Sequence, residues 1–379
     1  MSDPTLVNPV AYKQAFERIE EDEAKTVAAL EEIMVKMAAT VYEHTGHAMR
    51  AVHAKGHGLV RGELRVLDGL PAQLAQGLFA AQRSFPVLMR FSSPPAELLP
   101  DNVSTPRAVA IKVMGVAGAR VTGSEGATTQ DFLMVNDPLF GRTGPKAFLK
   151  AVKVVAATTD RAPGAKEVLS AVLRGTEKVL EAVGGESATL KSLGGHPQTH
   201  PLGETFFSQV PCLYGPYMAK FSLAPVSPAL MALKDKPLEA SGEERTDELR
   251  DAISGFFAVG DAGAAEWELR VQLCTDIEKM PIEDASVEWP QELSPFIAVA
   301  RLRVGPQRSW NDVQSPATED DLSFNPWHAL AAHRPLGSVM RARKQVYAAS
   351  VRHRGARNGC PVHEPRGVPL DDVRLTARV

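Results

Sequence analysis

The chain has 379 residues, of which 44% are hydrophobic and 23% charged, a composition that excludes a disordered or fibrous protein. Its 42 Lys and Arg residues nearly balance its 45 Asp and Glu residues, so net charge gives no reason to expect nucleic acid as a partner. Sparse cysteines, no secretory pattern and no apolar run long enough to span a bilayer predict a cytoplasmic protein without a membrane span.

The first part of the chain is predicted to form one helix followed by strands. Residues 9–43 repeat apolar residues at steps of three and four and are rich in Glu, Lys and Ala, which predicts a helix ending near Gly46. Four short segments rich in β-branched residues then alternate with Gly, Pro, Asn and Asp. These segments predict strands at 58–67, 86–93, 108–116 and 131–137.

The second part returns to helical character before further strands. Residues 146–192 have a helical pattern, and a connector rich in Gly, Pro and His follows. A last helix is predicted from about 336 to 352. Three more strands are predicted between these helical regions, at 217–226, 266–275 and 296–304. Long strand runs with helical excursions indicate an α+β protein built on a large antiparallel sheet or barrel.

We expect one continuous domain, because no internal repeat, low-complexity linker, P-loop, GxGxxG or HExxH motif is present. This domain would span residues 46–358 and include the 146–192 excursion. An N-terminal helical region (1–45) would precede it, and an irregular tail (359–379) would follow.

The last helix carries a basic run, RARKQVYAASVRHRGAR, around Tyr347. Arg343 lies one turn before this tyrosine, and Arg354 lies about two turns after it if the helix continues. A nearby guanidinium favours the phenolate, the form of tyrosine that ligates ferric iron. From spacing alone, however, an amphipathic basic helix whose tyrosine packs on a sheet is the simpler interpretation.

A second stretch, RAVHAKGHG (50–58), places Arg50 and His53 before small residues. Alone it indicates a hairpin with a structural histidine. The neighbouring His57 shows no Cys or carboxylate spacing of a metal site, so we expect it at the surface.

Three motifs occur in a fixed order along the chain: R50-x-x-H53-A-K-G-x-G, R90-F-S92 and R343-x-x-x-Y347-x-x-x-x-R352-H-R354. The segments EWELRVQL, MPIEDASVEWP, PFIAVARLRV and FNPWHAL lie between the second motif and the third. Together they resemble the haem catalase family over roughly residues 45 to 358. This resemblance implies a catalase-like antiparallel β-barrel with surrounding helices, and haem b (iron) buried between the barrel and the C-terminal helix.

The resemblance also implies roles for the residues of the three motifs. His53 matches the distal histidine, the general base that moves a proton between the peroxide oxygens. Ser92 matches the serine that fixes the tautomer of that histidine, and Val52 matches a small residue that restricts access to the iron. Tyr347 matches the iron ligand. The remaining matches are arginines: Arg343 would keep the ligand anionic, and Arg50, Arg90 and Arg354 would pair with the haem propionates.

One part of the family pattern is missing. Catalases carry a distal asparagine, and counting back from Asp137 places Thr128 at that position, with Gln130 as the nearest amide. Asn136 comes too late in this count. Phe140 would supply the aromatic that covers the haem face if one residue is skipped.

The resemblance implies a peroxide-reducing haem enzyme acting on hydrogen peroxide or organic hydroperoxides with an unidentified reductant. Because the long arms of large catalases are unmatched, we expect a more open site, a peroxidase with weak to moderate catalase activity, and a homodimer. A fatty-acid hydroperoxide isomerase or lyase of the same fold is an alternative, although those relatives carry threonine where this chain has Val52. A non-enzymatic haem-binding protein is a further alternative, yet haem storage needs no positioned base.

Overall fold

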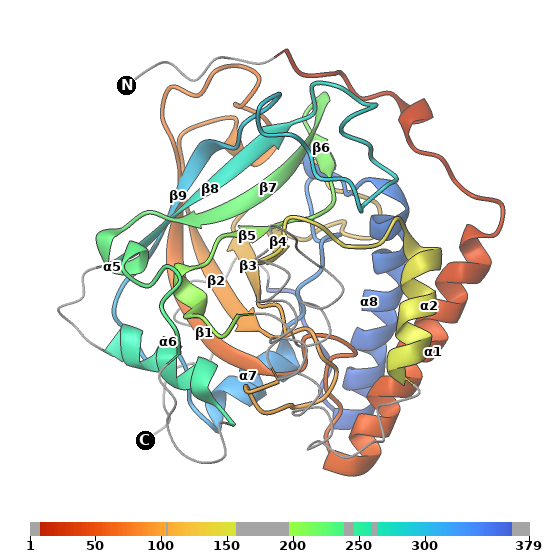
Figure 1. Ribbon diagram of the computed structural model, residues 1–379, viewed down its shortest axis with the longest axis vertical. Coiled ribbons are helices and arrows are strands. Elements are labelled where there is room, and N and C mark those ends of the chain that lie inside the picture. Colours follow the sequence, from red (N-terminus) through yellow and green to blue (C-terminus); the bar gives the residue numbers. More distant parts are fainter. Residues whose placement is uncertain (1–7, 104, 157–196, 239–245, 259–263, 366–379) are drawn as a thin grey trace, which may run out of the picture.

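The structure is a computed structural model that describes residues 8–103, 105–156, 197–238, 246–258 and 264–365 (Figure 1). Nine strands form one antiparallel sheet, and pairing of β5 with both β4 and β7 closes eight of them into a barrel. Around the barrel the strands run β5 (Phe206–Phe207), β4 (Thr129–Val135), β3 (Ala108–Met114), β2 (Ser84–Ser92), β1 (Gly56–Val66), β9 (Ile297–Val304), β8 (Ala265–Leu273) and β7 (Tyr217–Pro225), with β6 (Cys212–Tyr214) paired to β7.

Alternation along each strand separates a barrel interior from an outer face. On β2, Val87, Met89 and Phe91 belong to the apolar cluster that fills the barrel. The residues between them, Leu88 and Arg90, point to the other side of the sheet. Leu88 packs there against Leu322 and Phe324, so this part of the outer face is covered by chain rather than open to water.

Three helices form a layer on one side of the barrel (Figure 1). They are α1 (Glu23–Thr45), α2 (Pro145–Ala156) and α8 (Gly337–Asn358). The other helices are shorter: α5 (Pro228–Met231), α6 (Glu248–Ala258), α7 (Gln314–Asp321), and the 3₁₀ turns Gln14–Phe16, Gly77–Phe79, Pro201–Gly203 and Ala331–His333. Among the described residues, no helix has both the length and the apolar character that crossing a bilayer requires.

The predicted strands are confirmed, and the α+β antiparallel barrel with surrounding helices is the observed fold. The structure adds β5, β6 and helices α5 to α7, which the sequence patterns do not indicate. Of the predicted 146–192 helical region, α2 is described, and residues 157–192 lie outside the described residues.

The first helix begins later than predicted. Gly46 does end it, with φ of 71°, but α1 starts at Glu23 rather than near residue 9. Before it, Val10 N–H donates to the Cys274 carbonyl and Tyr12 N–H to the Pro216 carbonyl. These tertiary hydrogen bonds satisfy the backbone in an extended form and override the local helical pattern.

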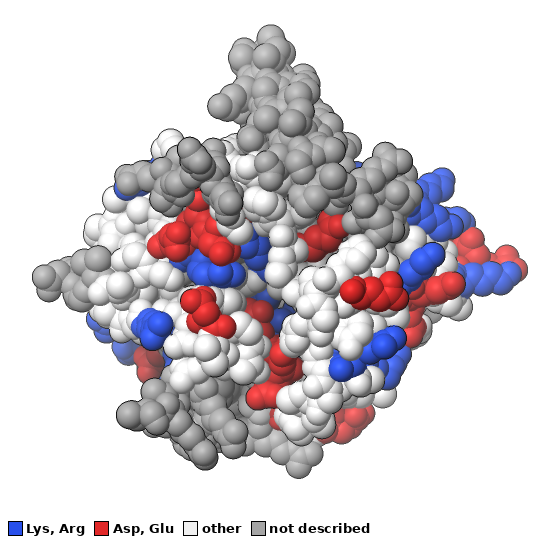
Figure 2. All heavy atoms as spheres, turned by 90° about the horizontal axis from the view of Figure 1, so that it is seen from below, with Lys and Arg blue, Asp and Glu red and all other residues white. Residues whose placement is uncertain are grey.

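Figure 2 shows the face of the molecule seen from below. Acidic and basic side chains are interspersed on the described part of this face, and neither sign gathers into an extended patch. The basic residues of the chain are therefore not concentrated here.

Candidate active site

His53 lies in the loop between α1 and β1, and its backbone is held in an uncommon conformation. The φ angle of His53 is 56°, a left-handed value that non-glycine residues adopt only when their surroundings impose it. Its N–H donates to the Pro94 carbonyl at 2.9 Å. Its Nδ1 lies 3.3 Å from Ser92 Oγ at the end of β2. The predicted His53–Ser92 contact is therefore present, and it leaves Nε2 as the nitrogen able to exchange a proton with a ligand.

The charges around His53 connect this loop with helix α8. Burial, followed by the positive charges of Arg90, Arg343 and Arg50 in that order, lowers the pKa of His53 to about 3. Arg343 belongs to α8, so the helix presents a cation to the histidine loop. His53 is therefore a neutral imidazole at physiological pH, the form that can accept a proton.

Helix α8 carries the tyrosine side of the site. Arg343 lies over the ring of Phe140, 5.7 Å from its centre, and its Nη1 is 3.9 Å from Met340 Sδ. Tyr347 follows one turn later and is half-buried. Within the described part of the chain its hydroxyl has no hydrogen-bond partner, so the phenol oxygen remains available to a ligand. Phe140 therefore packs against α8, the helix that carries Arg343 and Tyr347.

Val52 faces the layer of helices. It packs against a buried cluster that includes Met34 and Ala51, and Val346 of α8 packs against the same cluster. The backbone N–H of Ala51 also donates to Ser350 Oγ at 3.3 Å. The loop with Val52 and His53 is therefore attached to α8 on one side and to Ser92 on the other.

The three predicted propionate ligands, Arg50, Arg90 and Arg354, come together, and we call them the arginine trio. Arg90 is 2% exposed and Arg354 is 3% exposed. Their partners are the carboxylate of Glu319, the backbone carbonyls at the end of α7 and, for Arg90, the Ala54 carbonyl. The trio joins the loop before β1, strand β2 and helix α8 into one buried cationic centre.

The arginine trio holds more positive charge than its carboxylate partner neutralises. Glu319 is the one carboxylate in ion-pair contact with the trio among the described residues. Burial, followed by the charges of Arg90 and Arg354, holds the pKa of Arg50 well below its ordinary value. Arg354 Nε is buried and has no described hydrogen-bond partner. The charge of Asp320 also acts on Arg50 and Arg354, without an ion-pair contact to either among the described residues. A guanidinium does not lose its proton at physiological pH, so this buried concentration of positive charge fits a ligand with carboxylates, as haem has.

The register of the barrel separates Thr128 from this centre. Ser92 pairs with Ala108 on β3, and Ala108 pairs with Val135 on β4. Thr128 precedes β4 and lies seven residues from Val135 along the strand direction. Seven extended residues span about 23 Å. The structure therefore does not bring Thr128 beside Ser92.

Two amides near this strand are engaged elsewhere. Asn136 directly follows β4 at the Ser92 end, so the structure places it nearer than its position in the count suggests. Its Oδ1 accepts from the Arg107 N–H at 2.8 Å, and its Nδ2 donates to Glu204. Gln130 Oε1 accepts from the Leu330 N–H at 2.9 Å. Neither amide is thus held toward His53 by the contacts described.

His57 is not a surface residue, contrary to expectation. It is 2% exposed, and its Nε2 lies 2.6 Å from Ser93 Oγ. The pairing of β1 with β2 shifts between Gly56 and Gly58, so His57 sits in a bulge. A histidine in a bulge cannot be placed on one face of a strand from alternation alone.

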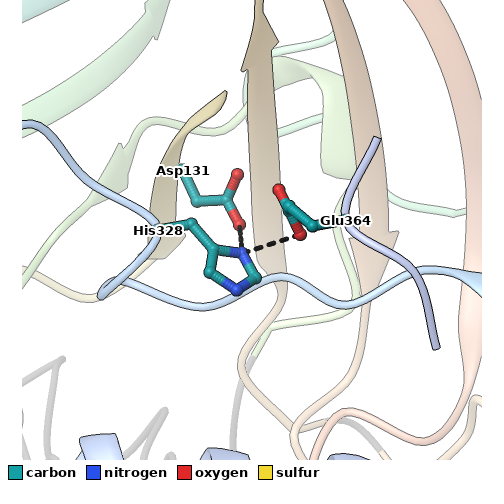
Figure 3. Close-up of side chains that lie close together, drawn as sticks. All are labelled: Asp131, His328 and Glu364. Atoms are coloured by element: carbon teal, nitrogen blue, oxygen red, sulfur yellow. Dashed lines mark hydrogen bonds and ion pairs between the residues drawn. The ribbon is translucent and has the colours of Figure 1, made fainter. Parts of the chain in front are cut away.

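Sequence reasoning also missed a polar cluster at β4, in which Asp131 of that strand meets His328 of a loop and Glu364 of the C-terminal tail (Figure 3). Asp131, His328 and Glu364 offer ligand atoms within 4.8 Å of one another, the spacing of a metal site. However, Lys112 Nζ lies 2.8 Å from Asp131 Oδ1 and 2.5 Å from Glu364 Oε1, and Lys112 is fully buried. The ammonium already supplies the cation, so we assign no metal here. The cluster instead fixes Glu364 of the C-terminal tail to the outer face of the barrel.

Acid should destabilise this protein through its buried histidines. Burial lowers the pKa of His200 and of His333 to about 4, and that of His57 well below 6.5. Below pH 6.5 the unfolded chain binds protons that the folded chain does not, so stability falls as the pH falls from 6.5 toward 4. Each such histidine contributes a slope of about 1.4 kcal/mol per pH unit.

Urea unfolding between pH 4 and pH 7.5 measures this slope. His200→Gln should flatten it, whereas His44→Gln, at an exposed position, should leave it unchanged. A free energy of unfolding that stays constant down to pH 4 would contradict the prediction.

Comparison with solved structures shows which known proteins share this fold. Catalase A from Saccharomyces cerevisiae matches with a TM-score of 0.58 and 15% identity, over 96% of this chain and 70% of that one. A fungal catalase gives 0.54 and 15%, over 95% and 68% of the two chains. A bacterial catalase gives 0.54 and 15%, over 97% and 67%. No protein-family model and no curated protein sequence matches the chain.

At 15% identity these matches establish the architecture and leave the activity to be argued from the site. They agree with the closed antiparallel barrel and with its flanking helices. The chain therefore has the catalase fold that its ordered sequence motifs predict.

Proposed function

We propose that this protein is a haem b-dependent enzyme that reduces peroxides. The observation that carries the proposal is the pairing of His53 with Ser92 in a loop that faces the Arg343 charge of α8. A haem carrier would need Tyr347 but no neutral histidine held by a serine. The arginine trio adds an anion-binding centre beside this pair. Residues 46–358 would form the haem domain.

The residues divide the chemistry between two sides of the bound group. Tyr347 would ligate the iron, and Arg343 would stabilise the phenolate by its charge. Bound haem supplies the redox chemistry that cleaves the oxygen–oxygen bond. His53 Nε2 would take the proton from one peroxide oxygen and return it to the oxygen that leaves, as water from hydrogen peroxide or as an alcohol from an organic hydroperoxide. Ser92 keeps the imidazole in the orientation and tautomer that this transfer needs.

We propose a peroxidase with weak to moderate catalase activity, which uses hydrogen peroxide or organic hydroperoxides and an organic electron donor. The engaged amides of Asn136 and Gln130 support this balance, because neither is free to orient a second peroxide. We further propose that the protein acts in the cytoplasm as a homodimer.

The absorption spectrum of the haem-supplemented protein, before and after cyanide, tests the proposal. We expect stoichiometric haem, a high-spin ferric spectrum of the tyrosinate type, and a shift with cyanide that reveals an open distal position. Absence of stoichiometric haem binding would refute the proposed function. Chromatography of the products of a lipid hydroperoxide then separates reduction to an alcohol from rearrangement to an epoxide, which would favour the isomerase alternative.

A further inference from the structure

Glu319 occupies the arginine trio in the manner of a carboxylate ligand. Its Oε1 accepts from Arg90 Nε at 2.6 Å, and its Oε2 accepts from Arg90 Nη2 at 3.0 Å. This two-bond fork is the geometry with which arginine recognises a carboxylate. Oε2 also lies 3.3 Å from Arg50 Nη1. The contacts that a propionate would make to Arg90 are thus already made by the protein itself.

The end of helix α7 reinforces this occupation. The Glu319 carbonyl accepts from Arg50 Nη2 at 2.8 Å and from Arg354 Nη1 at 3.1 Å. The Leu322 carbonyl accepts from the same two arginines, at 3.1 Å each. Carbonyls at a helix C-terminus carry partial negative charge. The trio therefore holds a carboxylate and a helix end together.

A glycine on β1 makes room for the carboxylate. A Cβ atom added at Gly56 would lie 2.3 Å from Glu319 Oε1, closer than any real contact. Burial raises the pKa of Glu319, but the charges of Arg90, Arg50 and Arg354 outweigh it and the pKa is lowered. Glu319 is therefore an ionised group in a fitted space.

We propose that Glu319 is an internal counter-ion that stabilises the arginine trio in the unliganded protein and is displaced from Arg90 when a propionate of haem binds. This inference rests on the proposed function. Haem affinity then depends on how much more strongly the guanidinium of Arg90 binds a haem propionate than it binds the carboxylate of Glu319. Glu319 thus stabilises the unliganded chain and weakens haem binding.

The substitution Glu319→Gln removes the charge at nearly constant shape. We expect a lower melting temperature for the unliganded protein, because the buried arginines lose their counter-ion. We also expect haem and metal-free protoporphyrin IX to bind about tenfold more tightly, because a neutral amide competes less well for a guanidinium. Thermal unfolding and fluorescence titration with protoporphyrin IX measure the two effects without any assay of turnover.

Glu17→Gln is the matched control. The Glu17 side chain is 10% exposed against 9% for Glu319, and it also pairs with two arginines, Arg334 at 2.8 Å and Arg341 at 3.1 Å. It lies outside the trio, so this variant should lose melting temperature and keep porphyrin affinity. The dimethyl ester of protoporphyrin IX lacks the carboxylates, and with it the gain of Glu319→Gln should disappear.

The outcomes separate this inference from the proposed function. If the wild-type chain binds no porphyrin, the proposed function fails and the inference fails with it. If the wild-type chain binds porphyrin and Glu319→Gln binds it equally or more weakly, only the inference is overturned. Should Glu319→Gln not fold, Glu319→Asp keeps the charge but shortens its reach, and an affinity equal to wild type would overturn the inference.

Discussion

Replacing His53 with alanine is expected to lower peroxide turnover by about 10²–10⁴-fold, the usual contribution of a positioned general base. Haem should remain bound, because the arginine trio and Tyr347 lie outside the substitution. The neutral state of His53, whose pKa burial lowers to about 3, also predicts that turnover shows no inflection near pH 6.5 from this residue. Steady-state assays with hydrogen peroxide from pH 5 to pH 8 measure both effects.

His44→Ala is the control for this experiment, since His44 is exposed at the end of α1 and should be dispensable. Ser92→Ala should have a smaller effect than His53→Ala, because it removes the group that orients the base and not the base. Turnover that survives His53→Ala with bound haem would refute the assigned proton transfer. A loss of haem in that variant would show instead that His53 supports the structure of the pocket.

The sequence predicts the barrel well because strand alternation is a local property. Segments such as 108–116 and 217–226 carry their own signal in branched and apolar residues, and the structure confirms them as β3 and β7. The residue at which α1 begins, in contrast, is not determined by the local sequence pattern. Residues 9–22 have a helical pattern, yet Val10 and Tyr12 donate to distant carbonyls and the segment forms no more than a short 3₁₀ turn at Gln14–Phe16.

Counting residues likewise does not show which residue of a neighbouring strand a given residue lies beside. The prediction of Thr128 assumed a fixed distance from Asp137, whereas the pairing of Ala108 with Val135 fixes which end of β4 meets Ser92. A count along one strand does not show which of its ends meets Ser92, because the register with the neighbouring strands decides that.

Glu319 was missed for a different reason. It belongs to a run of acidic residues, ATEDD, whose pattern indicates a solvent-exposed helix. The useful signal was complementarity: the basic run around Tyr347 requires buried negative charge, and this acidic run is the nearest one before it in the chain. Only the fold shows that Glu319 and Arg354 meet.

Replacing Tyr347 with phenylalanine is expected to have the largest effect on the cofactor. Tyr347 is the one residue assigned to ligate the iron, so its loss should weaken haem binding by at least about 100-fold, the upper range for changes that affect only supporting groups. Since its hydroxyl makes no hydrogen bond within the described chain, the variant should fold with near-native stability. Haem titration, the ferric spectrum and urea unfolding give the three measurements.

Tyr42→Phe is the matched control, because Tyr42 is likewise half-buried and lies against α8: Arg357 of that helix is 5.0 Å from its ring centre. It should leave haem affinity and the spectrum unchanged. A tyrosinate-type spectrum retained in Tyr347→Phe would mean that another residue ligates the iron. Loss of the tyrosinate spectrum together with unchanged affinity would mean that the arginine trio, rather than the iron ligand, dominates retention of haem. Glu319→Gln would then change haem affinity more than Tyr347→Phe does, because it alters the binding of the haem carboxylates and not the binding of the iron.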